Sequence, residues 1–113
     1  MPAGRLFIFG LGYTSLRLAD RLRGAGWSVA GTTRTVEKAA SLRAAGIDAF
    51  TFDRGQPLAD AALALAGATH ILSSVPPDER GEPVLDMHGA DIAARAGDLR
   101  WVGYLSTTGV YGD

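Results

Sequence analysis

Short apolar runs alternate along the chain with longer stretches of helical composition. Five runs rich in β-branched and aromatic residues predict buried strands, at 5–9, 27–33, 48–52, 69–73 and 101–106. Four stretches of helical composition predict helices, at 14–25, 36–45, 58–66 and 84–96. Strands and helices that alternate in this way are typical of a parallel sheet covered on both faces.

Residues at the ends of the helical stretches support these boundaries. Glycine follows each stretch, as expected where a helix ends in a left-handed residue, at Gly26, Gly46, Gly67 and Gly97. Thr35 predicts an N-cap for the second helix, and Pro57 and Pro83 suit the first turns of the third and fourth. In the first helix, the i, i+4, i+7 spacing of Leu18, Leu22 and Ala25 predicts the face that packs on the sheet, with Leu16 and Ala19 at neighbouring positions.

The order of the elements predicts one topology. Right-handed crossovers, with a turn to the opposite side after the third strand, give the strand order 3-2-1-4-5. We therefore predict a five-stranded, doubly wound α/β sheet of the Rossmann type, forming one domain over residues 1–113. In such a sheet a ligand crevice opens between the carboxyl ends of strands one and four.

Composition excludes several classes of protein. The chain is 47% hydrophobic and 20% charged, which separates it from disordered chains, and it has no cysteine for disulfides, thiolate metal sites or thiol catalysis. Its longest apolar run near the N-terminus, 6–12, is too short to span a membrane, so we expect a cytoplasmic protein. Neither His70 nor His88 has a partner at metal-ligand spacing, so we expect no metal site.

Charge is unevenly distributed although the net charge is only -1. Residues 1–56 carry eight Lys and Arg against four Asp and Glu, whereas residues 57–113 carry three against eight. We interpret the arginines at 17, 21, 23 and 43 as solvated faces of two helices. A nucleic-acid-binding protein would have a concentrated basic face, so we expect no nucleic-acid partner.

A G-x-G-x-x-S pattern joins the first strand to the first helix. Gly10 permits the tight turn, and Gly12, which has no Cβ, would let a pyrophosphate approach the backbone. The amides of Tyr13, Thr14 and Ser15 would open the helix, where free N–H groups favour an anion. Serine replaces the third glycine of the dinucleotide fingerprint, and its hydroxyl could also reach a phosphate. The alternative is a glycine turn that binds no ligand.

The end of the second strand predicts which dinucleotide is bound. Thr33 and Arg34 stand about 20 residues beyond the glycine turn, where an NAD site commonly places Asp or Glu. A guanidinium can pair with a 2′-phosphate, so Arg34 favours NADP over NAD. The alternative is an arginine that faces solvent. Thr32, Thr33 and Thr35 could add hydroxyl contacts, although threonine is also common in strands and caps.

Two further strand ends complete the expected cofactor site. Asp53 follows the third strand and could accept from the adenine amino group, or it could cap its own loop. After the fourth strand, Ser74, Val75 and Pro76 should pass beside the cofactor at the point where the strand order reverses. The prolines at 76 and 77 would hold that loop extended.

The segment after the fifth strand carries the most specific motif, Ser106 to Gly112, which reads S-T-T-G-V-Y-G. With it the chain resembles the extended short-chain dehydrogenase/reductases, a branch of NAD(P)-dependent epimerases and dehydratases. The resemblance spans essentially all 113 residues and only the first part of such an enzyme. It implies that Thr107, four residues before Tyr111 of the V-Y-G motif, contacts the substrate oxygen. It also implies an NADP-dependent reductase, epimerase or dehydratase that acts on a sugar-like substrate.

Two features depart from that family. Its extended members commonly have G-x-x-G-x-x-G, so this chain is similar to an atypical subgroup. The family's general base is the tyrosine of a Tyr-x-x-x-Lys pair, but the only lysine here is Lys38 and residue 34 is an arginine. We therefore expect that the base and the C-terminal substrate region are absent, and that the chain alone is inactive.

A non-catalytic role is the alternative from another class. In such a protein, dinucleotide binding would change a contact with another protein. A fifth strand with nothing following it would leave a sheet edge uncovered, so we also expect self-association through that edge.

Overall fold

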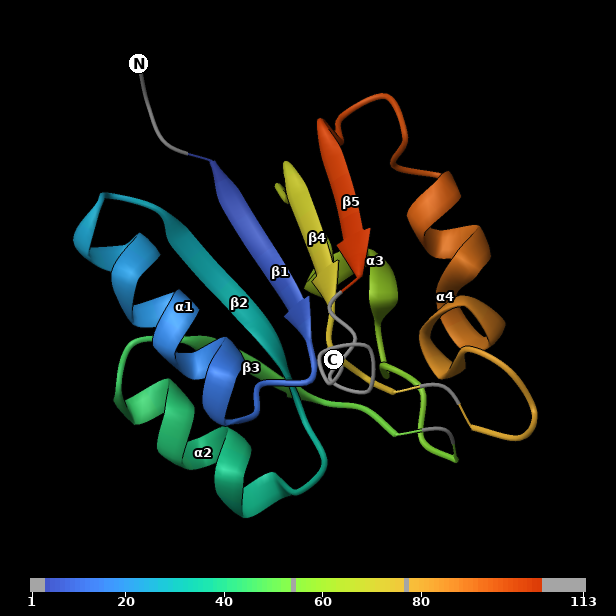
Figure 1. The fold of residues 1–113 in the computed structure, drawn as a ribbon, viewed down its shortest axis with the longest axis horizontal. Coiled ribbons are helices and arrows are strands. Elements are labelled where there is room, and N and C mark those ends of the chain that lie inside the picture. The colour runs from blue at the N-terminus through green and yellow to red at the C-terminus, as the bar shows by residue number, and fades with distance from the viewer. Residues whose placement is uncertain (1–3, 54, 77, 105–113) are drawn as a thin grey trace, which may run out of the picture.

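Five parallel strands form one sheet, with two helices on each of its faces (Figure 1). The computed structural model describes residues 4–53, 55–76 and 78–104. In chain order the elements are β1 (Arg5–Phe9), α1 (Tyr13–Gly24), β2 (Ser28–Thr33), α2 (Val36–Ala44), β3 (Asp48–Thr51), α3 (Ala61–Ala64), β4 (His70–Ser73), α4 (Pro83–Ala93) and β5 (Trp101–Tyr104). The strands lie in the order β3-β2-β1-β4-β5, which confirms the predicted order.

The core is divided by the sheet into two layers. Phe7 and Phe9 of β1 belong to the cluster that packs against α3 and α4, whereas Leu6 and Ile8 belong to the cluster under α1 and α2. Successive strand residues point to opposite faces, so the continuous apolar run of β1 supplies both layers. All four side chains are buried.

The third helix is much shorter than the sequence predicts. It covers only Ala61–Ala64, and Asp60 caps it by accepting a hydrogen bond from the N–H of Leu63 at 3.0 Å. Pro57 therefore does not lie in its first turn, because the capping carboxylate sets the start three residues later. Leu58, expected to be helical, instead enters the core from the segment that precedes α3.

The other helix ends follow the prediction more closely. Thr35 caps α2 by accepting from the N–H of Lys38, and Pro83 stands in the first turn of α4. Gly26, Gly46 and Gly67 all have positive φ, as a glycine after a helix commonly does. Gly97 does not, because α4 ends earlier than predicted, at Ala93.

The buried face of α1 agrees with the predicted one in part, since Ala19 is buried and Leu16 and Leu22 pack against the core. Ser15 and Ala19 are its buried residues, whereas Leu18 is 36% exposed and Leu22 is half-buried. Small side chains at 15 and 19 let the helix lie close to the strands behind the glycine turn, and Leu18 lies toward solvent. The spacing rule selects the leucines because they are large and apolar. It does not take into account how closely the helix approaches the sheet.

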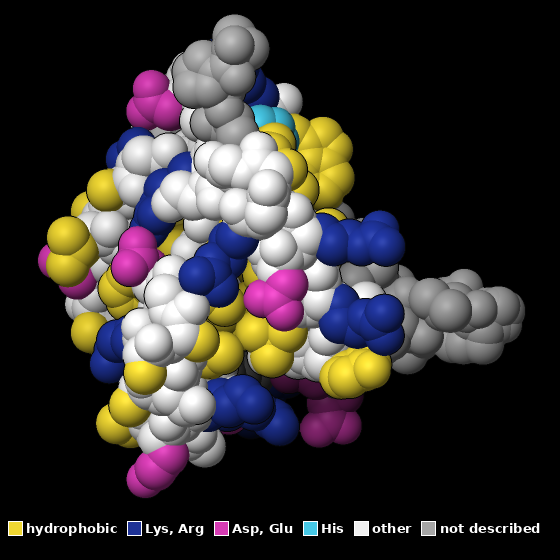
Figure 2. Space-filling view, turned by 90° about the vertical axis from the view of Figure 1, so that its left-hand side faces the viewer, with side chains coloured by type: hydrophobic (Ala, Val, Ile, Leu, Met, Phe, Trp, Pro, Cys, Tyr) yellow, Lys and Arg dark blue, Asp and Glu magenta, His cyan; other side chains and the backbone are white. Residues whose placement is uncertain are grey.

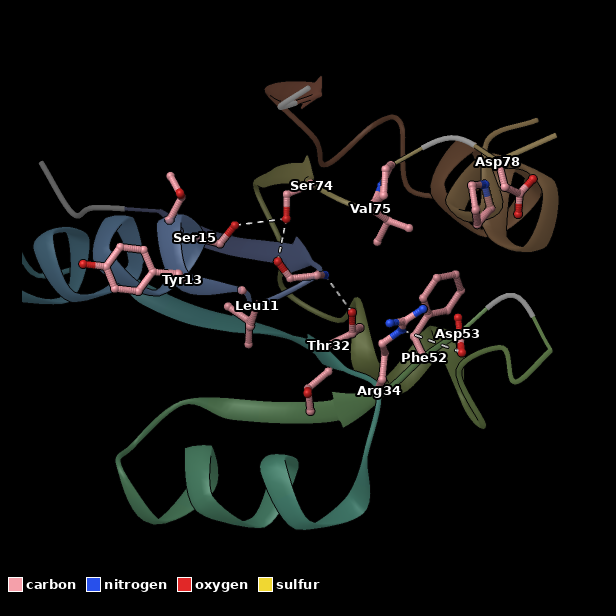
Figure 3. A pocket seen from close by; sticks show the side chains of 16 residues that line it. Leu11, Tyr13, Ser15, Thr32, Arg34, Phe52, Asp53, Ser74, Val75 and Asp78 are labelled. Carbon is pink, nitrogen blue, oxygen red and sulfur yellow. Dashed lines mark hydrogen bonds and ion pairs between the residues drawn. The ribbon is translucent and has the colours of Figure 1, made fainter. Parts of the chain in front are cut away.

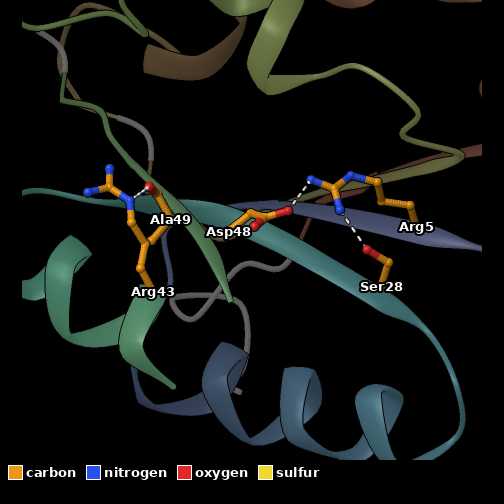
Figure 4. Close-up of polar contacts among 5 residues, drawn as sticks. All are labelled: Arg5, Ser28, Arg43, Asp48 and Ala49. Carbon is orange, nitrogen blue, oxygen red and sulfur yellow. Dashed lines mark hydrogen bonds and ion pairs between the residues drawn. The ribbon is translucent and has the colours of Figure 1, made fainter. Parts of the chain in front are cut away.

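The amino ends of three strands are tied together by one arginine (Figure 4). Arg5 of β1 donates to the Ser28 hydroxyl of β2 at 2.6 Å and pairs with Asp48 of β3 at 2.9 Å. Arg43 of α2 donates to the carbonyl oxygen of Ala49 at 2.8 Å and so joins α2 to β3. These contacts lie at the amino ends of the strands and leave the carboxyl ends open for a site.

Lys and Arg side chains are spread over the face shown in Figure 2, with hydrophobic and acidic groups between them. Arg17 and Arg21 are exposed, which confirms their interpretation as solvated helix residues; Arg43 is also exposed, but its Nε contacts β3. Arg23 is half-buried and donates to the carbonyl oxygen of Ala45 at 2.9 Å, so it links α1 to the end of α2. None of the described helices is long and apolar enough to cross a membrane.

Candidate functional site

A pocket of about 520 Å³ opens at the carboxyl ends of the strands. It is bounded by the glycine turn after β1, the ends of β2 and β3, and the loop that follows β4 (Figure 3). β1 and β4 are neighbours in the sheet although two strands and three helices separate them in sequence. The pocket therefore lies where the strand order reverses, which is where parallel α/β sheets bind ligands.

Gly10 is required by the fold of the turn itself. Its φ is +94°, a left-handed value, and a Cβ there would lie 2.9 Å from the Ser74 hydroxyl. The turn is held against β2 by two hydrogen bonds to Thr32. The N–H of Gly10 donates to its hydroxyl at 2.9 Å, and the N–H of Leu11 donates to its carbonyl oxygen at 2.7 Å. Thr32 is buried, so its hydroxyl shapes the turn from behind.

Gly12 has no comparable requirement. Its φ is −91°, which any residue adopts, and a Cβ there would have no atom of the described residues within 4 Å. It stands at the N-cap of α1, where no side chain accepts a hydrogen bond from the first turn. The first residue that donates back along the helix is Leu16, to the carbonyl oxygen of Gly12 at 2.9 Å. The preceding N–H groups therefore favour an anion at this end of the pocket.

Ser15 and Ser74 join the glycine turn to the loop after β4. The Ser15 hydroxyl donates to that of Ser74 at 3.0 Å, and the Ser74 hydroxyl donates to the carbonyl oxygen of Gly10. Ser15 is only 2% exposed, so its small side chain packs as the third glycine of the fingerprint would. Its hydroxyl is already hydrogen-bonded to protein, which differs from the expected reach toward a phosphate.

Two opposite charges stand at the other end of the pocket. Nε of Arg34 lies 3.9 Å from a carboxylate oxygen of Asp53 (Figure 3). Their side chains are 80% and 50% exposed, so both are accessible to a ligand. Phe52, between β3 and Asp53, is buried and forms part of the apolar floor.

The structure brings together all of the residues predicted for cofactor binding. Eleven residues from four separate segments line this one pocket: Gly10, Gly12, Tyr13, Thr14, Ser15, Thr33, Arg34, Asp53, Ser74, Val75 and Pro76. Thr107, predicted to contact substrate, and Tyr111 lie outside the described residues. Their roles stay predictions.

Four lining residues were not anticipated, namely Leu11, Phe52, Asp78 and Pro83. Leu11 could have been found, because it stands between the two glycines of the turn. Phe52 could also have been found from the sequence, because it directly precedes Asp53. Asp78 and Pro83 have no comparable signal, since their position depends on the path of the loop between β4 and α4.

Both histidines pack against aromatic side chains of the protein. His88 is buried and stacks on Phe9, with ring centroids 6.0 Å apart. His70 is half-buried beside Trp27, with ring centroids 4.8 Å apart. Within the described ranges, no group of three or more His, Asp or Glu side chains could hold a metal ion.

Solved structures resemble the chain, whereas no protein-family model and no curated protein matches it. A conserved protein of unknown function from Silicibacter pomeroyi DSS is 44% identical, with a TM-score of 0.77 over 98% of this chain. The chain spans only 37% of the length of that protein.

Two other similar structures have lower identity. The TrkA-N domain of the inner membrane protein ybaL from Escherichia coli is 14% identical, with a TM-score of 0.62 over 89% of this chain and 72% of its own. A dipicolinate synthase polypeptide from Bacillus halodurans is 18% identical, with a TM-score of 0.51 over 67% of this chain and 24% of its own. The chain folds as a Rossmann-type domain. Such low identity shows the fold alone, so membership of the short-chain dehydrogenase/reductases stays a prediction.

Proposed function

We propose that this Rossmann-type domain binds a nicotinamide dinucleotide, with NADP preferred over NAD. The observation that carries the proposal is Gly12. Neither backbone conformation nor packing among the described residues demands a glycine there, yet the position borders the pocket at the uncapped start of α1. A ligand group that approaches the backbone closely explains the missing side chain, and a pyrophosphate at a helix N-terminus is such a group.

The other lining residues suit the remaining parts of a dinucleotide. The first-turn amides of Tyr13, Thr14 and Ser15 would hold the pyrophosphate. Arg34, at the end of β2, would pair with a 2′-phosphate, since a guanidinium pairs with phosphate through two N–H groups. Val75 packs against the core, and its loop would lie beside the cofactor where β4 ends.

A class of reaction follows from the same proposal. A nicotinamide cofactor supplies or accepts hydride. The resemblance to the extended short-chain dehydrogenase/reductases implies the finer class, so we infer that the domain serves a reductase, epimerase or dehydratase with a sugar-like substrate. Thr107 would contact that substrate. Lys38, the only lysine, is exposed on α2 and lies outside the residues that line the pocket, so it cannot assist a tyrosine there. We therefore propose that the chain by itself binds cofactor without catalysing turnover.

Titration of the 113-residue chain with NADPH, followed by calorimetry, tests the binding proposal. We expect wild-type protein to bind and Gly12→Ala to weaken binding by about tenfold or more, because a methyl group would stand where the pyrophosphate approaches. Thermal stability should fall only modestly in Gly12→Ala, because the added Cβ has open space around it and alanine is a weaker N-cap than glycine by about 1 kcal/mol or less.

Gly24→Ala is the matched control. Gly24 lies at the opposite end of α1, and a Cβ there also has nothing within 4 Å. This variant should bind NADPH as wild type does. Absence of binding to wild-type protein, or equal affinity of Gly12→Ala and wild type, would contradict the proposed function.

A further inference from the structure

Arg34 and Asp53 form a pair of opposite charges whose positions are fixed by the sheet. β2 and β3 run parallel with Thr33 opposite Thr51, and the N–H of Phe52 donates to the carbonyl oxygen of Thr33 at 2.9 Å. Arg34 directly follows Thr33, and Asp53 directly follows Phe52. Adjacent strand ends therefore deliver one cation and one anion to the same corner of the pocket (Figure 3).

The backbone on both sides of the pair is held in place. Arg34 stands between Thr33 of β2 and Thr35, whose hydroxyl caps α2. Asp53 exchanges two backbone hydrogen bonds of 2.9 Å with Gln56, one in each direction. Each charged side chain thus projects from an anchored backbone position, although the side chains themselves are accessible to a ligand.

The two charged side chains favour different forms of the cofactor's adenosine ribose, one with a free 2′-hydroxyl and one with a 2′-phosphate. A carboxylate accepts a hydrogen bond from a 2′-hydroxyl, which is the role that Asp or Glu at the end of β2 has in NAD sites. A guanidinium pairs with a 2′-phosphate, and a carboxylate nearby repels it. Here the expected acid is missing from the end of β2, but Asp53 brings one to the same corner from β3.

We propose that Arg34 and Asp53 together make this site accept both NADP and NAD, with Asp53 as the acceptor for the unphosphorylated ribose. The inference rests on the proposed dinucleotide binding. Because the pair has no net charge, the preference of Arg34 for the 2′-phosphate is offset by the repulsion from Asp53. Exposed ion pairs have small effects, so the wild-type preference for NADPH over NADH is less than about tenfold.

The test is the ratio of the dissociation constants for NADH and NADPH, measured by calorimetry on the intact chain. The two cofactors differ only at the 2′ position, so contacts to adenine, pyrophosphate and nicotinamide cancel in this ratio. We expect Asp53→Asn to weaken NADH, strengthen NADPH and raise the ratio by about tenfold. Arg34→Gln should move the ratio in the opposite direction by a similar factor.

Asp78→Asn is the matched control, since Asp78 lines the same pocket from the loop after β4 and loses the same charge. It should change the ratio by less than about twofold. An equal shift in Asp78→Asn would assign the effect to the overall charge of the pocket and overturn the role of the pair.

Two other results would overturn this inference while leaving the proposed function intact. Asp53→Asn could weaken both cofactors equally, as a contact to adenine requires, or it could leave both affinities unchanged. If wild-type protein binds neither cofactor, the proposed function fails and this inference fails with it.

Discussion

His88 illustrates how one side chain can depend on a distant element. Its Nε2 accepts a hydrogen bond from the N–H of Leu58 at 2.9 Å, so Nδ1 carries the proton and donates to Asp91 at 2.9 Å. Leu58 needs this partner because α3 starts only at Ala61, and its buried N–H cannot bond within a helix. Sequence patterns treat His88 as uninformative, since the need arises thirty residues away.

Replacing His88 with phenylalanine should therefore destabilise the fold. His88→Phe keeps a ring against Phe9 and Phe52 but leaves the N–H of Leu58 buried without an acceptor. We expect the free energy of unfolding to fall by about 1–3 kcal/mol, measured by urea denaturation.

Asp91→Asn is the control for this prediction. It retains an oxygen that accepts from Nδ1, and Asp91 is itself half-buried, so its cost should be under about 1 kcal/mol. Stability of His88→Phe equal to that of wild type would show that the contact to Leu58 contributes nothing.

At the scale of elements, the sequence predicts which helices and strands form. It predicts their boundaries and their buried faces less accurately. All five strands, the four helices and their order follow from hydrophobic period and turn residues, because these signals are local. The predicted start of α3 was wrong because Pro57 suits a first helical turn, whereas the helix starts after Asp60, whose carboxylate caps it. The inward face of α1 depends on how closely the helix approaches the sheet, which no spacing rule contains.

Gly31 marks a close approach between neighbouring elements. A Cβ on this β2 residue would lie 2.5 Å from the carbonyl oxygen of Ile8 and 2.7 Å from the side chain of Leu11. Both atoms belong to β1 and the glycine turn, and a carbonyl cannot swing aside. Gly31→Ala should lower the free energy of unfolding by about 1–3 kcal/mol, as measured by urea denaturation.

Gly89→Ala is a comparison variant for which we expect the free energy of unfolding to rise instead of fall. Gly89 lies inside α4, and a Cβ added to it would have nothing within 4 Å, so alanine gains helix propensity without a clash. The same measurement should show stabilisation of about 0.5–1 kcal/mol. If both substitutions changed stability alike, crowding would not be the reason for glycine at position 31.

At the scale of the whole molecule, one side of the sheet carries apolar surface. Within the described residues β5 pairs only with β4, and the sheet surface near it on the α1 side forms a shallow groove with Leu18, Leu22 and Trp27. Trp101 of β5 lines the same groove and is 49% exposed. Strand edges with apolar side chains are templates for pairing with another chain.

We therefore expect the 113-residue chain to self-associate through β5. Val102, on the opposite face of this strand, is 52% exposed. Sedimentation velocity over a range of concentrations should show association of wild-type protein that decreases in Val102→Lys, because a charge on an edge strand opposes pairing. A wild-type chain that stays monomeric throughout would contradict this expectation.

The contacts of Ser74 have a consequence for how the pocket responds to a ligand. Its hydroxyl is bonded to both Ser15 and Gly10, so the loop after β4 and the turn after β1 are connected before any ligand arrives. A pocket wall assembled during folding loses little conformational entropy on association. The protein thus presents a preorganised pocket, in which Ser74 joins the two loops.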